Sequence, residues 1–182
     1  MGTKFTIDGY AQLELNNVAF RRDGRIEAQC ALSTEDFTDA APAEVGMILA
    51  VDKVNNMIKL PVEGDNLPRA LHYSTEHMYD ERKLGLKDFC LKPGEFHPRM
   101  GYLAIGDLFT TNCLAYEGYA DEAALMDALK VCHETAVFGK EDATGRICLV
   151  AEKPASGLIF KVAKYYTMPN GTPGVKLQVI SC

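Results

Sequence analysis

The chain has 182 residues, 47% of them apolar, and carries a formal net charge of −6 at pH 7. This length and apolar content allow one sizeable hydrophobic core, or two small ones, to fold without disulfides or bound metals. The acidic charge argues against nucleic acid as a main partner, because neutralising phosphates requires a basic surface, and no apolar run reaches the roughly 20 residues of a membrane span.

Alternating apolar and polar residues predict several short strands in the first 60 residues. Residues 4–19 form one or two of them, and no apolar signal segment precedes them, so we expect synthesis in the cytoplasm. The Asp23-Gly24 pair is a strong hairpin signal, which makes residues 26–32 the expected return strand. After a polar loop over residues 33–44, residues 45–60 predict a second strand pair around a turn at residues 52–56.

A long irregular connection occupies residues 61–98 and is rich in proline and glycine. One short helix is expected within it, over residues 75–84. The turn residues near its end divide the chain into a β-rich N-terminal region, residues 1–98, and a C-terminal β domain, residues 99–182. Long connections in compact domains are typically binding or disordered segments, so we expect this one, including His97, to supply a contact surface.

The C-terminal region combines strands with one amphipathic helix. Residues 103–115 are strand-like on both sides of a Gly106-Asp107 turn. Asp121 is the expected cap of a helix whose apolar residues Leu125, Leu129 and Cys132 share one face, which favours packing against a sheet. Short strands over residues 135–138 and 146–151 follow.

A half-buried antiparallel hairpin is predicted over residues 158–180. Apolar residues alternate along both of its strands, and the alternation slips near Ala163, where a bulge fits. Pro169, Asn170 and Gly171 suit the turn, with Gly171 taking a positive φ. Together these elements predict a mainly β fold, an antiparallel barrel or sandwich-like domain with one or two short helices.

Four side chains, His72, His77, Cys90 and His97, form the best candidate for a metal site, because tetrahedral zinc accepts these ligand types. Their spacing matches no zinc module, and the sequence lacks the phosphate-binding and hydrolytic motifs. A zinc-binding or enzymatic domain using these residues is therefore the alternative function, whereas ordinary loop histidines and a buried cysteine are the structural interpretation.

Other pairs of reactive residues have a simpler structural interpretation. Cys132 and His133 are adjacent on a helix and point about 100° apart, which places the thiol on the core face and the imidazole in solvent. Asp107 with Glu117 or Asp121 could form a carboxylate pair, but Gly106-Asp107 is ordinary turn sequence. The six cysteines are widely spaced, and we expect free thiols, with Cys30 and Cys148 acting as small buried hydrophobes.

The tip of the last hairpin is the main candidate interaction surface. Tyr165 and Tyr166 put aromatic rings on both faces of one strand, close to Asn170 and Gly171. Either the second face is covered within the domain, or the tip contacts a partner.

Three segments carry a family resemblance: IGDLFTTN at residues 105–112, VAKYYTMPNG at residues 162–171 and GVKLQV at residues 174–179. They resemble small structural proteins of tailed bacteriophages that accompany the major capsid protein. The resemblance covers mainly the last 80 or so residues.

The resemblance implies a decoration, cement or auxiliary protein of the capsid, without enzymatic activity or a cofactor. Its partners would be the major capsid protein and copies of itself, and neither nucleic acid nor a membrane. It would be made in the cytoplasm of the bacterial host and located in the virion. Residues 1–98 carry no resemblance and leave open another virion position, such as a head fibre or tail component. A β-rich host adaptor or ligand-binding module is a third hypothesis for the whole chain.

Overall fold

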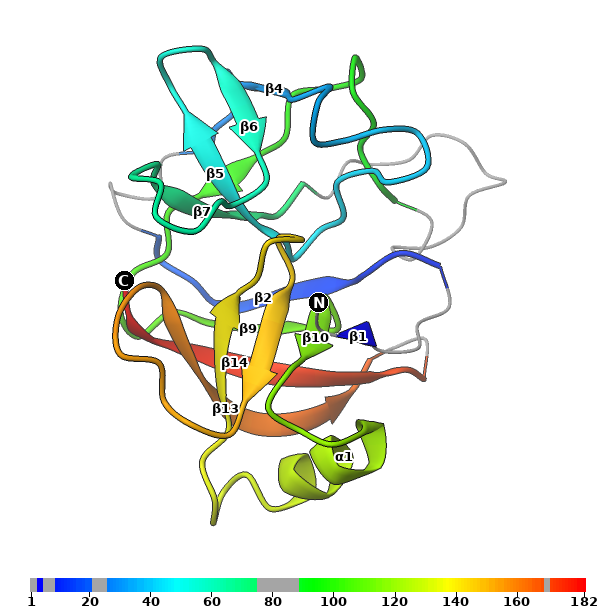
Figure 1. Cartoon of the computed structure of the whole chain (residues 1–182), viewed down its shortest axis with the longest axis vertical. Helices are drawn as coiled ribbons and strands as arrows, with labels where there is room; N and C mark the ends of the chain where they lie inside the picture. Colours follow the sequence, from blue (N-terminus) through cyan, green and yellow to red (C-terminus); the bar gives the residue numbers. More distant parts are fainter. Residues whose placement is uncertain (1–2, 5–8, 21–25, 75–88, 169–170) are drawn as a thin grey trace.

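The computed structural model describes residues 3–4, 9–20, 26–74, 89–168 and 171–182. These residues form two β-sheets, one above the other in Figure 1, and one helix. The prediction of a mainly β fold with one or two short helices is confirmed. Most strand pairs are antiparallel. The parallel pairs are β4 (Ala31–Leu32) with β6 (Met57–Lys59) and β10 (Leu114–Tyr116) with β12 (Ile147–Val150).

The eight-stranded sheet has the order β1-β10-β12-β11-β13-β14-β9-β2 and curls around the lower core (Figure 1). Its strands are β1 (Thr3–Lys4), β2 (Leu13–Asn17), β9 (Leu108–Thr111), β10 (Leu114–Tyr116), β11 (Phe138–Glu141), β12 (Ile147–Val150), β13 (Ile159–Thr167) and β14 (Pro173–Ser181).

The predicted hairpin is the centre of this sheet. Phe160 and Val162 on β13 and Leu177 and Val179 on β14 are buried, and the Phe160 ring meets that of Phe109 edge-on, with 5.6 Å between centroids. The register shifts between Val162 and Lys164, which confirms the expected bulge.

The six-stranded sheet has the order β3-β8-β7-β5-β6-β4. Its strands are β3 (Ile26–Glu27), β4 (Ala31–Leu32), β5 (Ile48–Asp52), β6 (Met57–Lys59), β7 (Arg69–His72) and β8 (Met100–Gly101). β5 is buried along its whole length and pairs with β6 around a turn, as predicted. The Asp52 carboxylate shapes that turn by accepting hydrogen bonds from the backbone N–H groups of Val54 and Asn55.

The predicted hairpin between residues 4–19 and 26–32 is wrong, although Asp23 and Gly24 themselves lie outside the described residues. β2 pairs with β9, whereas β3 pairs with β8 and β4 with β6 in the other sheet. The chain changes sheets at Phe20, which has a positive φ of 57° and whose ring packs against Tyr73. The Asp107 carboxylate fixes this bend by accepting from the backbone N–H groups of Ala19 and Phe20.

The helix α1 (Glu122–Lys130) begins and packs as predicted. The side chain of Asp121 caps it by accepting from the Ala124 N–H at 2.8 Å, and Leu125 and Leu129 are buried. Just beyond its end Cys132 is buried and His133 is exposed. The helix lies at the end of the molecule away from the six-stranded sheet (Figure 1). The other predicted helix, over residues 75–84, lies outside the described residues.

Residues 26–101 supply the six-stranded sheet, whereas residues 3–17 and 108–181 together supply the eight-stranded sheet. The division into residues 1–98 and 99–182 stays a prediction about folding units, and β1, β2 and β8 pair across that boundary. In the part of the chain described, no helix is long and apolar enough to cross a bilayer.

Replacing Gly171 by valine should destabilise the hairpin. Gly171 has a φ of +84°, and a Cβ there would meet no atom within 4 Å, so the cost is backbone strain alone. We expect a loss of about 1–3 kcal/mol, seen as a lower Tm in thermal unfolding. Gly171→Asn is the matched control, because asparagine tolerates positive φ and should lose clearly less. Equal Tm values for the valine variant and the wild type would contradict the turn assignment.

Candidate functional site

A buried ion pair lies where the two sheets meet. The guanidinium of Arg146, the residue just before β12, donates from Nη2 to Oε1 of Glu44, and Arg146 and Glu44 are only 7% and 6% exposed. The other Glu44 oxygen accepts from the Ala11 N–H at 2.7 Å, and Arg146 Nη1 lies 3.7 Å from the Cys113 Sγ. The pair thus joins the loop before β5 to two segments of the eight-stranded sheet. Because its groups are shielded from solvent and bound to each other, it holds the sheets together.

His72 adds a second polar contact at this junction. Its Nδ1 lies 2.8 Å from the Glu44 carbonyl oxygen, and the side chain is fully buried. A carbonyl only accepts, so Nδ1 carries the proton of the neutral ring. Burial lowers the His72 pKa to about 4, opposed weakly by this hydrogen bond. The imidazole is therefore neutral at pH 7 and acts as a structural donor.

The candidate zinc ligands do not gather in the described structure. His72 is buried in β7, Cys90 is half-buried and His97 is exposed on a loop, while His77 lies outside the described residues. No group of three or more His, Cys, Asp or Glu side chains suited to a metal occurs among the described residues. The zinc-binding hypothesis thus receives no support from the three ligands that are placed.

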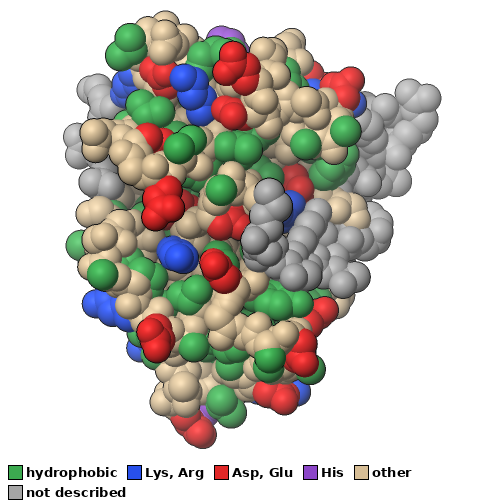
Figure 2. Space-filling view, in the orientation of Figure 1, with side chains coloured by type: hydrophobic (Ala, Val, Ile, Leu, Met, Phe, Trp, Pro, Cys, Tyr) green, Lys and Arg blue, Asp and Glu red, His purple; other side chains and the backbone are tan. Residues whose placement is uncertain are grey.

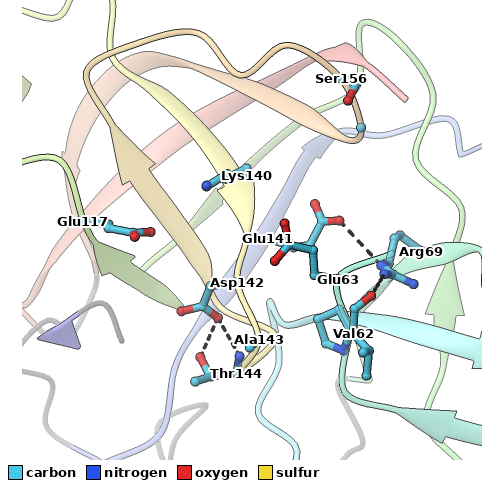
Figure 3. A pocket seen from close by; sticks show the side chains of 12 residues that line it. Val62, Glu63, Arg69, Glu117, Lys140, Glu141, Asp142, Ala143, Thr144 and Ser156 are labelled. Atoms are coloured by element: carbon cyan, nitrogen blue, oxygen red, sulfur yellow. Dashed lines mark hydrogen bonds and ion pairs between the residues drawn. The ribbon is translucent and has the colours of Figure 1, made fainter. Parts of the chain in front are cut away.

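A cavity of about 460 Å³ opens at the surface beside the sheet junction (Figure 3). Its walls come from residues 61–63, from Arg69 and Glu117, from the β11–β12 hairpin at residues 140–144, and from residues 156–157. In the middle of the face shown in Figure 2, acidic side chains lie close together around a basic one. Arg69 forms ion pairs with Asp65, with 2.6 Å between Nη1 and Oδ1, and with Glu141, with 3.5 Å between Nε and Oε1.

The remaining charged groups of this cavity have different surroundings. Asp142 organises its own turn by accepting from the Thr144 N–H and hydroxyl. Glu117 lies 3.6 Å from the Cys148 Sγ, and burial with this carboxylate raises the Cys148 pKa to about 12, so the thiol stays protonated. Glu63, Glu117 and Lys140 are exposed and form no ion pair with any described residue. The cavity therefore offers carboxylates beside an apolar wall of Pro61, Val62 and Ala143.

The tip of the β13–β14 hairpin carries four of the interaction residues predicted from the sequence: Tyr165, Tyr166, Asn170 and Gly171. Tyr165 is half-buried against the core opposite Val175, and Tyr166 is half-buried opposite Gly174. The turn closes through hydrogen bonds from the Gly171 N–H to the Met168 carbonyl and from the Met168 N–H to the Thr172 carbonyl. Pro169 and Asn170 lie outside the described residues. The Tyr165 ring thus packs against the core of the same chain. A partner contact at this tip stays a prediction.

Glu44 and Arg146 were missed from the sequence. Glu44 stands in a segment predicted as a polar loop, and Arg146 precedes an apolar strand, a position where a charged residue is ordinarily solvated. Their 102-residue separation gives no local signal. Asp107, considered as one of a carboxylate pair, is instead a buried acceptor for backbone N–H groups.

No protein-family model matches this chain, and neither a curated protein nor a solved structure matches it.

Removing the arginine of the buried pair should be costly. Arg146→Met leaves the Glu44 carboxylate buried without its arginine, and we expect a loss of about 3–5 kcal/mol in unfolding free energy. Adding Glu44→Gln removes that charge while keeping an acceptor for the Ala11 N–H, so the double variant should be more stable than Arg146→Met alone. Urea unfolding of the three proteins tests this, and a double variant no more stable than the single one would contradict it.

Acid should destabilise the fold through His72. The folded pKa of about 4 lies below the unfolded value of about 6.5, so only the unfolded chain binds this proton between them. The contribution of neutral, buried His72 to the unfolding free energy is complete above about pH 6.5. It falls by about 3 kcal/mol as the pH drops to about 4.

His72→Asn is the matched variant for this measurement, because its amide can still donate toward the Glu44 carbonyl but does not titrate. The difference in unfolding free energy between wild type and variant should therefore change with pH across that window. Parallel pH profiles for the two proteins would show that His72 is not responsible.

Proposed function

We propose that this chain is a non-enzymatic structural protein of a tailed-bacteriophage virion, which binds the capsid surface as a decoration, cement or auxiliary protein. The observation that carries the proposal is the arrangement of the three segments that resemble such proteins. They contain β9 and most of β13 and β14, which are neighbours in the order β13-β14-β9. The resemblance thus falls on one continuous piece of sheet.

Exposed apolar side chains on tight turns supply a surface for such binding. Val54, in the β5–β6 turn, is 91% exposed, and Phe96, in the segment before β8, is 73% exposed. In Figure 1 both segments lie at the end of the molecule opposite α1. Large apolar groups held on ordered turns bury area on contact at little further entropic cost, so we propose that this end faces the capsid shell.

The packing between the sheets fits a protein that must hold neighbouring subunits in place. The buried pair of Glu44 and Arg146 and the hydrogen bond from the Ile48 N–H to the Gly145 carbonyl, at 2.7 Å, join the six-stranded sheet to the eight-stranded one. Because the two sheets are joined in this way, the end of the molecule that carries Val54 is held in a fixed position relative to the eight-stranded sheet.

The test is binding of the purified chain to intact particles that lack it. We expect saturable binding that survives washing, in a fixed ratio to the main shell protein, measured by sedimentation and mass spectrometry. Val54→Ser with Phe96→Ser should weaken binding about tenfold or more. Ile105→Ser is the control, because Ile105 is also 69% exposed but lies beside β9. Failure of the wild-type chain to bind such particles would overturn the proposal.

A further inference from the structure

Three lysines share the outer face of the hairpin β13–β14. Lys164 lies directly opposite Lys176, and Lys161 lies opposite Gln178, two residues along the same strand from Lys176. Residues paired across a ladder point to the same side of the sheet, and the core residues Val162, Leu177 and Val179 occupy the other side. We call Lys161, Lys164 and Lys176 the lysine face.

No acidic side chain lies on this side of the two adjoining strands, β11 and β9, and the next strand, β2, carries Glu14 opposite Thr110. The neighbouring positions on this side of the sheet are Phe138 and Lys140 on β11 and Leu108 and the buried Thr110 on β9. None of the three lysines forms an ion pair with a residue that the structure describes. Like charges directly opposite each other destabilise a sheet, so Lys164 and Lys176 would be stabilised by carboxylates from another molecule.

The cavity beside the sheet junction is acidic overall, because Glu63, Glu117, Glu141 and Asp142 outnumber Arg69 and Lys140 among its lining residues. Glu63 is an exposed carboxylate beside the apolar wall of Pro61 and Val62, and Glu117 is an exposed carboxylate on the other side of the cavity, beyond Lys140 in the view of Figure 3. Neither carboxylate forms an ion pair with a described residue. A lysine side chain matches such a site, because its aliphatic stem packs on apolar surface while its ammonium group meets the carboxylates.

We propose that two copies of this chain associate by placing the lysine face of one against the Glu63 and Glu117 cavity of the other. The lysine face and the acidic lining of the cavity belong to the same chain, so a second copy supplies a complementary surface to each of them. This interface joins two copies of the chain directly and does not depend on binding to a capsid.

Charge reversal on each side tests this pairing. Variant one carries Lys161→Glu and Lys164→Glu, and variant two carries Glu63→Lys and Glu117→Lys. We expect the wild type to associate at low salt and to dissociate as salt is raised, as observed by sedimentation equilibrium. Each variant alone should associate at least about tenfold more weakly than the wild type. An equimolar mixture of the two variants should associate again, because each reversed surface then meets a surface of opposite charge.

Lys53→Glu with Lys92→Glu is the control, since it makes the same change in net charge as variant one, in the β5–β6 turn and in the segment before β8, and should leave association unchanged. A wild-type chain that stays monomeric at low salt and at the highest soluble concentration would overturn the proposal. So would a mixture of the two variants that stays monomeric, or a control that loses association equally. This assay contains no capsid, so its failure and that of particle binding are observed separately.

Discussion

The ion pair between Glu44 and Arg146 is the interaction on which the arrangement of the two sheets depends. It joins residues 102 positions apart, in segments that belong to different sheets, and its atoms are almost fully removed from water. Burying two charges costs several kcal/mol per ion unless their remaining hydrogen-bonding capacity is met. Here the Ala11 N–H and the Cys113 sulfur meet part of it, which ties the N-terminal segment to the same point. The pair therefore fixes one relative placement of the sheets.

Close backbone contact around this pair requires two glycines. A Cβ at Gly46 would lie 2.6 Å from the Thr111 hydroxyl, and one at Gly145 would lie 2.8 Å from a Leu49 methyl group. Both residues also have a positive φ. The β11–β12 turn can thus approach β5 closely enough for the Ile48 N–H to bind the Gly145 carbonyl. The polar pair supplies specificity at this junction, and the glycines supply the space.

This junction also places the surfaces on which the proposed functions rest. The cavity forms because the β11–β12 hairpin reaches the connection between β6 and β7, so its walls exist only when the sheets are joined. The lysine face belongs to strands whose opposite side is core, which holds its charges at fixed spacing. A structural protein that acts by contact needs such surfaces to be ordered before binding, because ordering them afterwards would reduce affinity.

Local sequence signals determined the elements that are stabilised by near neighbours. The last hairpin, its bulge, the β5–β6 pair and the capped helix α1 were all predictable, since alternation, turn residues and the Asp121 cap act within a few positions. The same reasoning failed at residues 4–32. There, Leu13 lies opposite Thr111 and Leu15 opposite Phe109, in a strand far along the chain, while residues 26–32 pair in the other sheet.

The residues of the candidate site also divide into those placed by local signals and those placed by long-range packing. The sequence supplied the charges and the turn chemistry, but which of them meet was decided by tertiary structure. Glu44 and Arg146 carry no shared local pattern, and the Glu63 and Glu117 carboxylates lie at one cavity only because two sheets are packed together. Sequence alone determined strand periodicity, caps and turns, because these depend on backbone geometry over a few residues. Only the tertiary structure decided sheet partners, the buried ion pair and the cavity, because long-range burial sets their free energy.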